Sequence, residues 1–215
     1  HGVFRLEVCH FHLPDYRPET ADELRHVAEE TGVELQSLLA DFGDLANEET
    51  SFEDLQELRR WKKFAARAGF GRMRVIAGDV EPTSANLDRA IGGLRSLAEL
   101  PGPRIAIENW KRLLPDAQRV NRVLDALDGS VGLCLDFGNW ESPLKERELP
   151  KIARRAETSH AKARWNGDEF DAADYDRMLG ILTDAQFRGP AVIVDGSSDE
   201  DPWPRIDRLL DRLSL

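Results

Sequence analysis

Four residues that could bind a divalent metal follow one another along the chain, each at the end of a predicted strand. They are Glu108, Asp136, His160 and Asp195. Carboxylate and imidazole ligands without a thiolate suit Mn²⁺, Mg²⁺ or Co²⁺, and Zn²⁺ also accepts them. The pattern indicates a site for one divalent ion, with Mn²⁺ or Mg²⁺ the first expectation. The competing interpretation is that the acids only cap the helices that follow them.

Strand-length apolar runs alternate with amphipathic segments, and this alternation predicts the elements that position these residues. The runs recur about every 30 residues, which is the length of one βα unit, so they predict a parallel sheet. The predicted strands are Val3–Cys9, Val33–Leu39, Met73–Ala77, Arg104–Glu108, Val131–Asp136, Glu157–Ala161 and Ala191–Val194.

Helical spacing of apolar residues predicts six helices between and after these strands. The first is expected to begin at Thr20, where Thr20 and Glu23 form a capping-box pattern. The second is expected to run from Ser51 to a stop at Gly69. The others are predicted over Ala85–Leu100, Asp116–Leu127, Ala172–Ala185 and Trp203–Leu213.

Alternation within the strands distinguishes a barrel from a doubly wound sheet. Within 104–108 and 131–136, large aliphatic residues occupy one face, and small or polar residues occupy the other. A doubly wound sheet carries helices on both faces and is apolar on both, whereas the inside of a barrel accommodates polar groups. The pattern therefore predicts an α/β fold with one (β/α) barrel domain over residues 1–215. Glu108, Asp136 and His160 fall on its inner face, where strand ends form the mouth of such a barrel.

Composition excludes several classes of protein. The chain has 215 residues, a net charge of −11 and two cysteines, Cys9 and Cys134. No apolar run approaches the roughly 20 residues that a membrane helix needs. The negative charge argues against sequence-independent binding of nucleic acid, which requires a basic surface. We expect neither a membrane nor a nucleic acid as partner. Two cysteines cannot form a disulfide framework, so a reducing cytoplasm is the expected compartment.

Four segments together resemble the sugar phosphate isomerase/epimerase family, the xylose isomerase-like TIM barrel group that also includes endonuclease IV. They are IAIEN at 105–109, GLCLDFGN at 132–139, SHAKA at 159–163 and DYDRMLGIL at 174–182. Any one of them would be a weak signal, but their order and spacing are specific.

The resemblance implies a chemistry and a role for each residue. In such proteins one divalent metal, held from four successive strands, binds two oxygens of a keto-sugar while carboxylates move a proton through an enediolate. Carried over, Glu108 would be a metal ligand and the base, and Asp136 and His160 would be ligands. Lys162 would contact the substrate or its oxyanion, and Asp195 would be the last ligand and second carboxylate.

Two features depart from the family pattern. The family places its last ligand, a glutamate, five residues after a glycine; counted from Gly189 that position is Val194, and Asp195 comes one residue later. A one-residue step turns a side chain to the other face of a strand, so Asp195 would need a bulge or a shifted strand end. The family's first βα unit should also precede His1, so the barrel is expected to lack that unit.

These observations leave three functions open. The first is a metal-dependent isomerase or epimerase acting on a small sugar or sugar phosphate, and assembly into a homo-oligomer is left open for it. The second is a degenerate barrel that binds a polyol or a protein partner without turnover. The third, a DNA repair enzyme similar to endonuclease IV, would need more ligands and a basic groove. His10 and His12 are interpreted as structural, and Trp110, Trp140 and Trp165 as either walls of a sugar site or helix-packing residues.

Overall fold

Strands and helices alternate along the chain as the sequence pattern predicts. The computed structural model describes residues 2–167, 169–194 and 201–213. Two units can be distinguished, one spanning Gly2–Gly132 and the other beginning at Leu133. The prediction of a single domain over residues 1–215 stays a prediction.

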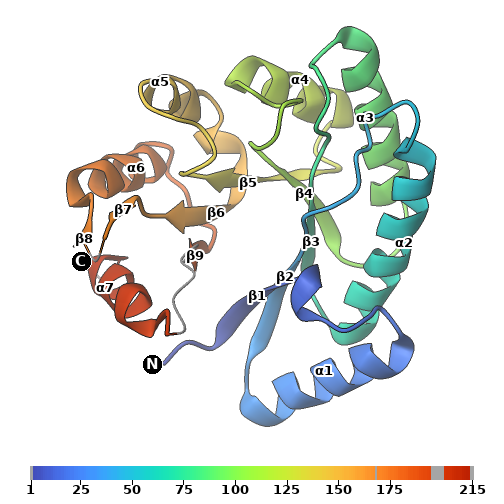
Figure 1. Cartoon of the computed structure of the whole chain (residues 1–215), viewed down its shortest axis with the longest axis horizontal. Helices are drawn as coiled ribbons and strands as arrows, with labels where there is room; N and C mark the ends of the chain where they lie inside the picture. Colours follow the sequence, from blue (N-terminus) through green and yellow to red (C-terminus); the bar gives the residue numbers. More distant parts are fainter. Residues whose placement is uncertain (1, 168, 195–200, 214–215) are drawn as a thin grey trace. The chain divides into compact units, whose positions relative to one another are not determined.

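The N-terminal unit is a run of parallel strands with helices between them (Figure 1). Its strands pair in chain order, and each neighbouring pair is parallel. The strands are β1 (Arg5–Cys9), β2 (Glu34–Ala40), β3 (Arg72–Val75) and β4 (Arg104–Glu108). The helices are α1 (Pro18–Thr31), α2 (Ser51–Ala68), α3 (Ser84–Ala98) and α4 (Ala117–Leu127), with a 3-10 turn η1 (His10–His12) after β1.

The start of the first helix is a correction to the sequence analysis. Helix α1 begins at Pro18, not at Thr20, and no side chain caps it. The Thr20 hydroxyl instead donates to Asp15 at 2.6 Å. Proline suits the first helical position, because its fixed φ matches the helix and its missing N–H would have no partner there. The pattern at Thr20 and Glu23 is therefore not a capping box.

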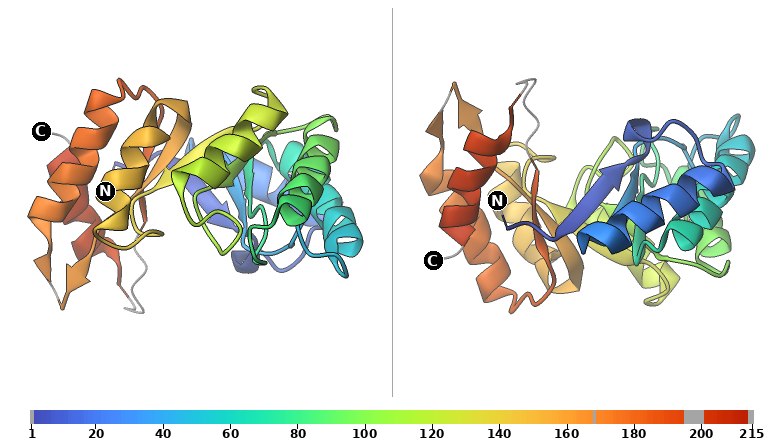
Figure 2. Two further views of the ribbon diagram at one scale, coloured as in Figure 1. Left: turned by 90° about the horizontal axis from the view of Figure 1, so that it is seen from above. Right: turned by 90° about the horizontal axis from the view of Figure 1, so that it is seen from below.

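The C-terminal unit contains the other parallel strands. Strand β6 (Ala156–Lys162) lies between β5 (Gly132–Asp136) and β9 (Ala191–Val194). Helices α6 (Ala172–Asp184) and α7 (Trp203–Leu213) lie side by side (Figure 2), and Arg212 Nε of α7 donates to Asp176 of α6 at 2.8 Å. The remaining elements, which the sequence analysis did not predict, are α5 (Leu144–Glu148), η2 (Leu149–Lys151), η3 (Ala153–Arg155), and the antiparallel pair β7 (Trp165–Asn166) and β8 (Glu169–Phe170).

The bulky faces of β4 and β5 are buried, as the alternation requires. Ile105 and Ile107 of β4 have at most 1% of their surface exposed, and so do Leu133 and Leu135 of β5. Burial of aliphatic side chains of this size contributes roughly 1.5–3 kcal/mol each. Among the described residues, no helix is both long and apolar enough to cross a membrane.

One buried charge holds the end of a helix in the N-terminal unit. Lys62 of α2 is only 2% exposed. Its Nζ atom donates to the carbonyl oxygens of Leu97 and Leu100, at 2.8 and 2.7 Å, where α3 ends. Burial lowers the pKa of Lys62, but the two carbonyls compensate the ammonium for lost water. Lys62 is therefore a C-terminal cap supplied by a neighbouring helix.

Replacing this lysine tests its role. We expect Lys62→Met to lower the free energy of unfolding by about 1–3 kcal/mol, because two buried carbonyls lose a charged donor. The matched control is Lys63→Met, which changes an exposed neighbour on the same helix and should stay within about 0.5 kcal/mol. Denaturant titration of both variants measures the difference. Equal effects would show that the cap contributes nothing.

Candidate active site

Glu108 ends β4 in the N-terminal unit, and its carboxylate pairs with an arginine of the neighbouring strand. Arg74 of β3 stands opposite Ala106 in the parallel register, and Ala106 shares a face with Glu108 because side chains alternate along a strand. Arg74 Nε lies 2.9 Å from Glu108 Oε2, and the two side chains are 5% and 4% exposed. A buried carboxylate is thus held against a fixed guanidinium.

The same guanidinium holds the end of β2. Its Nη1 atom donates to Asp41 Oδ1 at 2.5 Å and to the Ala40 carbonyl at 3.3 Å. Its Cζ atom lies 5.5 Å from the centroid of the Trp110 ring. Arginine suits this place, since a planar guanidinium can serve carboxylates and an aromatic face at once. One side chain therefore links the ends of β2, β3 and β4.

Sequence analysis missed Arg74, although a signal for it was present. In β3, the side chains of Met73 and Val75 are fully buried and apolar, and Arg74 alternates with them. The parity rule that singled out Glu108 would have placed Arg74 on the polar face as well. The pairing with Asp41 is different, because it joins residues 33 positions apart and no local pattern indicates it.

Asp136 and His160 end neighbouring strands in the C-terminal unit. They face each other in the register of β5 and β6, and His160 Nδ1 lies 3.5 Å from Asp136 Oδ2, both side chains being 4% exposed. The other oxygen, Oδ1, accepts a hydrogen bond from the Gly138 backbone N–H at 2.5 Å. The predicted placement of these two residues on one face is confirmed within this unit.

Lys162 follows His160 on the same face of β6 and lies against the backbone of the loop after β5. A Cβ atom added to Gly138 would come within 2.9 Å of Lys162 Cδ and 3.4 Å of Asp136 Oδ1. The absent side chain of Gly138 is therefore what lets the lysine stem lie beside Asp136. Lys162 also lines a small cavity in this unit, together with Trp140.

Asp195, the proposed last ligand, lies outside the described residues. The last residue of β9 is Val194, which stands opposite Lys162 in the register with β6. Whether Asp195 turns inward therefore stays a prediction.

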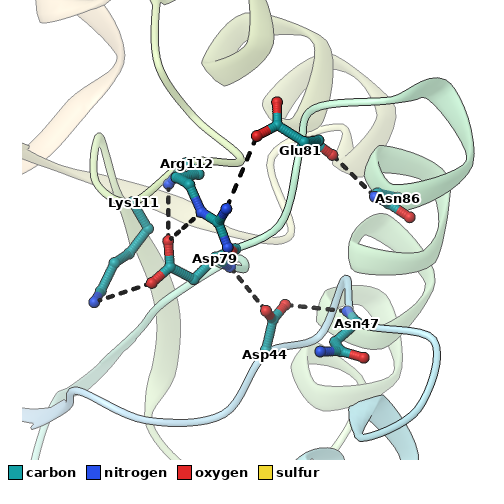
Figure 3. A network of polar contacts seen from close by, with 7 residues as sticks. All are labelled: Asp44, Asn47, Asp79, Glu81, Asn86, Lys111 and Arg112. Atoms are coloured by element: carbon teal, nitrogen blue, oxygen red, sulfur yellow. Dashed lines mark hydrogen bonds and ion pairs between the residues drawn. The ribbon is translucent and has the colours of Figure 1, made fainter.

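A polar network fixes the loop that follows Glu108 (Figure 3). The Asp79 carboxylate accepts from the backbone N–H of Arg112 at 3.2 Å and lies 3.4 Å from Lys111 Nζ. The Asp79 N–H donates to Asp44 Oδ2 at 3.0 Å. Burial raises the pKa of Asp79, but the Arg112 hydrogen bond and the Lys111 charge outweigh it, so the pKa is lowered overall. The loops after β2, β3 and β4 are thereby held together.

The two histidines of the first turn differ in their burial. The Nδ1 atom of His10 accepts from the Asp41 backbone N–H at 3.4 Å, and its ring centroid lies 4.7 Å from that of Phe42. Burial lowers the pKa of His10, which favours the neutral ring. His12 is exposed and lies with its centroid 4.5 Å from that of Phe11.

The three tryptophans divide between the two interpretations. Trp110 contacts Arg74 as described above, and Lys111 Nζ lies 4.6 Å from its ring centroid. Trp140 is 6% exposed and lines the cavity beside Lys162. Trp165 packs on the hairpin instead, with its ring centroid 5.4 Å from that of Phe170. Trp110 thus contacts Arg74 of the candidate site, and Trp140 shares a cavity with Lys162.

Comparison with known proteins agrees with the predicted fold. The family model described as xylose isomerase-like TIM barrel matches residues 2–213. Among curated protein sequences there is no match. The fold class predicted from strand alternation is therefore confirmed by the family model.

Solved structures resemble almost the whole chain. A xylose isomerase domain protein from Planctomyces limnophilus superposes with a TM-score of 0.77 at 17% identity, covering 98% of this chain and 86% of that one. A D-psicose 3-epimerase studied in the presence of D-fructose gives 0.74 at 14% identity, with coverages of 99% and 88%. A xylose isomerase-like TIM barrel protein from Mycobacterium smegmatis in complex with magnesium gives 0.70 at 17%, with coverages of 92% and 79%. At such identities the likeness is one of fold.

The ion pair of Arg74 with Glu108 yields a stability prediction. We expect Arg74→Met to lower the free energy of unfolding by about 3–5 kcal/mol, because it leaves a buried carboxylate without its countercharge. Arg60→Met is the control: it removes an exposed arginine that pairs with Glu57 at 2.7 Å and should cost at most about 1 kcal/mol. Denaturant unfolding compares the two. A small effect of Arg74→Met would mean that Glu108 does not depend on the guanidinium.

Proposed function

Since the chain belongs to the xylose isomerase-like TIM barrel family, we propose that it is a metal-dependent isomerase or epimerase of a sugar or sugar phosphate. The observation that carries the proposal is the pairing of Asp136 with His160 at neighbouring strand ends. The likeness in fold to D-psicose 3-epimerase supports a keto-sugar substrate. A cytoplasmic location and a small sugar as partner belong to the same proposal.

The proposed metal ligands are Glu108, Asp136, His160 and Asp195. Asp136 and His160 pair within one unit, and Glu108 and Asp195 join them on the strength of the family resemblance. Two carboxylates and a neutral imidazole fit Mn²⁺ or Mg²⁺ first, and Co²⁺ or Zn²⁺ next. The magnesium complex of the mycobacterial protein supports an ion of this kind. When bound, such an ion stabilises negative charge on substrate oxygens.

The chain's own residues would carry the proton. Glu108 is the proposed base, and its ion pair with Arg74 would keep the carboxylate in one orientation while it removes the proton next to the carbonyl. Lys162 would donate a hydrogen bond to a negatively charged oxygen of the substrate. Asp195 would return the proton from the opposite face, which inversion at one carbon requires.

Metal binding is the first test. We expect the purified chain, stripped with EDTA, to bind one Mn²⁺ per molecule by isothermal titration calorimetry. Asp136→Asn and His160→Gln should each weaken binding by roughly 100-fold or more, since even outer residues of metal sites cost 10–100-fold. Glu99→Gln, an exposed change elsewhere, serves as control. Unchanged affinity in the first two variants would rule out these ligands.

The second test concerns Asp195. We expect Asp195→Asn to lower turnover of a panel of ketoses by about 10²-fold or more, because the variant cannot accept a proton. Asp184→Asn, at an exposed position, should leave turnover unchanged. Product analysis by chromatography measures both. If Asp195→Asn leaves turnover and metal content unchanged, Asp195 is no catalytic carboxylate; a chain that binds metal without any turnover would be the non-catalytic polyol-binding barrel.

A further inference from the structure

The cavity beside Lys162 has an unbalanced set of charges. It measures about 140 Å³ and lies within the C-terminal unit. Its charged lining residues are Glu141, Lys145, Lys162, Arg164 and Asp174. Three of these are cations and two are acids. Which charge stays available to a ligand therefore depends on which of these residues form ion pairs with one another.

Both acids are already matched by cations. Asp174 Oδ2 accepts from Lys145 Nζ at 2.5 Å, and the two side chains are 6% and 4% exposed. The other oxygen of Asp174 accepts from Arg177 at 3.2 Å. Glu141 pairs with Arg164 at 3.0 Å in a more exposed position. Neither acid therefore depends on Lys162 for its countercharge.

Lys162 is the cation that remains. Within the described part of the chain it has no ion-pair partner, and its side chain is half-buried. The stem lies close to the backbone of Gly138, since a Cβ atom added there would meet Lys162 Cγ at 3.4 Å and Cδ at 2.9 Å. The two carboxylates that line the cavity already have cationic partners, so the ammonium group of Lys162 leaves a surplus positive charge there. It can donate hydrogen bonds to a ligand.

We propose that this cavity binds an anionic oxygen group of the substrate, a phosphate ester or a carboxylate, through Lys162. The proposal rests on the function proposed above and narrows its substrate class to acidic sugar derivatives. The size agrees, since 140 Å³ is the space of roughly four to five liquid waters. That space accommodates one phosphate or carboxylate group. Trp140, which is 6% exposed, forms an apolar wall.

The test uses small probes and the metal-free chain, so that a bound metal cannot hold the anion. Inorganic phosphate, acetate and glycerol are titrated into the EDTA-treated protein and followed by ¹H–¹⁵N NMR. We expect phosphate or acetate to shift the amides of Gly138 and residues 162–164, and glycerol to leave them unmoved. Higher affinity for phosphate would indicate a phosphate ester as the natural group, and higher affinity for acetate would indicate a carboxylate.

Variants separate the role of Lys162 from general charge. Lys162→Met should weaken anion binding by at least about tenfold, whereas Lys162→Arg should retain it. Gly138→Ala keeps the charge but displaces the lysine stem, and should weaken binding as well. Lys151→Met is the control, because this exposed lysine pairs with Glu148 at 2.7 Å outside the cavity. Absence of anion shifts, equal shifts with glycerol, or unchanged binding by Lys162→Met would overturn the proposal.

The outcome is separable from that of the proposed function. Mn²⁺ titration tests the metal ligands, and the anion titration tests Lys162 with no metal present. A chain that binds Mn²⁺ but no anion keeps the proposed reaction and loses the acidic substrate. A chain that binds phosphate but no Mn²⁺ keeps the anion site, and its ligand is then no substrate of a metal-dependent isomerase.

Discussion

The fixed register of neighbouring parallel strands is the constraint on which the polar pair of each unit depends. Residues that stand opposite each other in a parallel pair point to the same face. The register therefore brings Arg74 to Glu108 in the N-terminal unit and His160 to Asp136 in the C-terminal unit. A shift of one residue in either pair would turn one partner to the helix-covered face. The position of each polar group is thus fixed by backbone hydrogen bonds rather than by its own contacts.

Periodicity predicted the elements well, because strand and helix patterns are local. Arg104–Glu108 and Ala191–Val194 have the predicted bounds, and Ser51 and Trp203 begin their helices as expected. The error at Thr20 has a local cause too: Pro18, two residues earlier, provides a helix start that needs no side-chain cap. The hairpin of β7 and β8 has strands of two residues each, which are too short for any alternation to be recognised.

The candidate site was predicted less completely, because part of it depends on residues distant in sequence. Parity placed Asp136 and His160 together, since each sits in its own strand pattern. Nothing local indicates that Arg74 also serves Asp41, or that Lys145 and Asp174, 29 positions apart, neutralise each other in the interior. A buried ion pair of this kind satisfies its own charges and so withdraws them from ligands. The charge that a cavity presents to a ligand can therefore be determined only once its internal ion pairs are known.

The bare α-carbon of Gly138 has a consequence for how the protein can change over evolutionary time. Its N–H holds the Asp136 carboxylate while its missing side chain makes room for Lys162. A substitution at this position would disturb the carboxylate of Asp136 and the side chain of Lys162 together. Neither contact can therefore be changed through Gly138 without affecting the other. Glu141 and Arg164 sit at the rim of the same cavity, largely exposed to solvent. Substitutions at these two exposed residues would change the charge that lines the cavity and leave the backbone at Gly138 untouched.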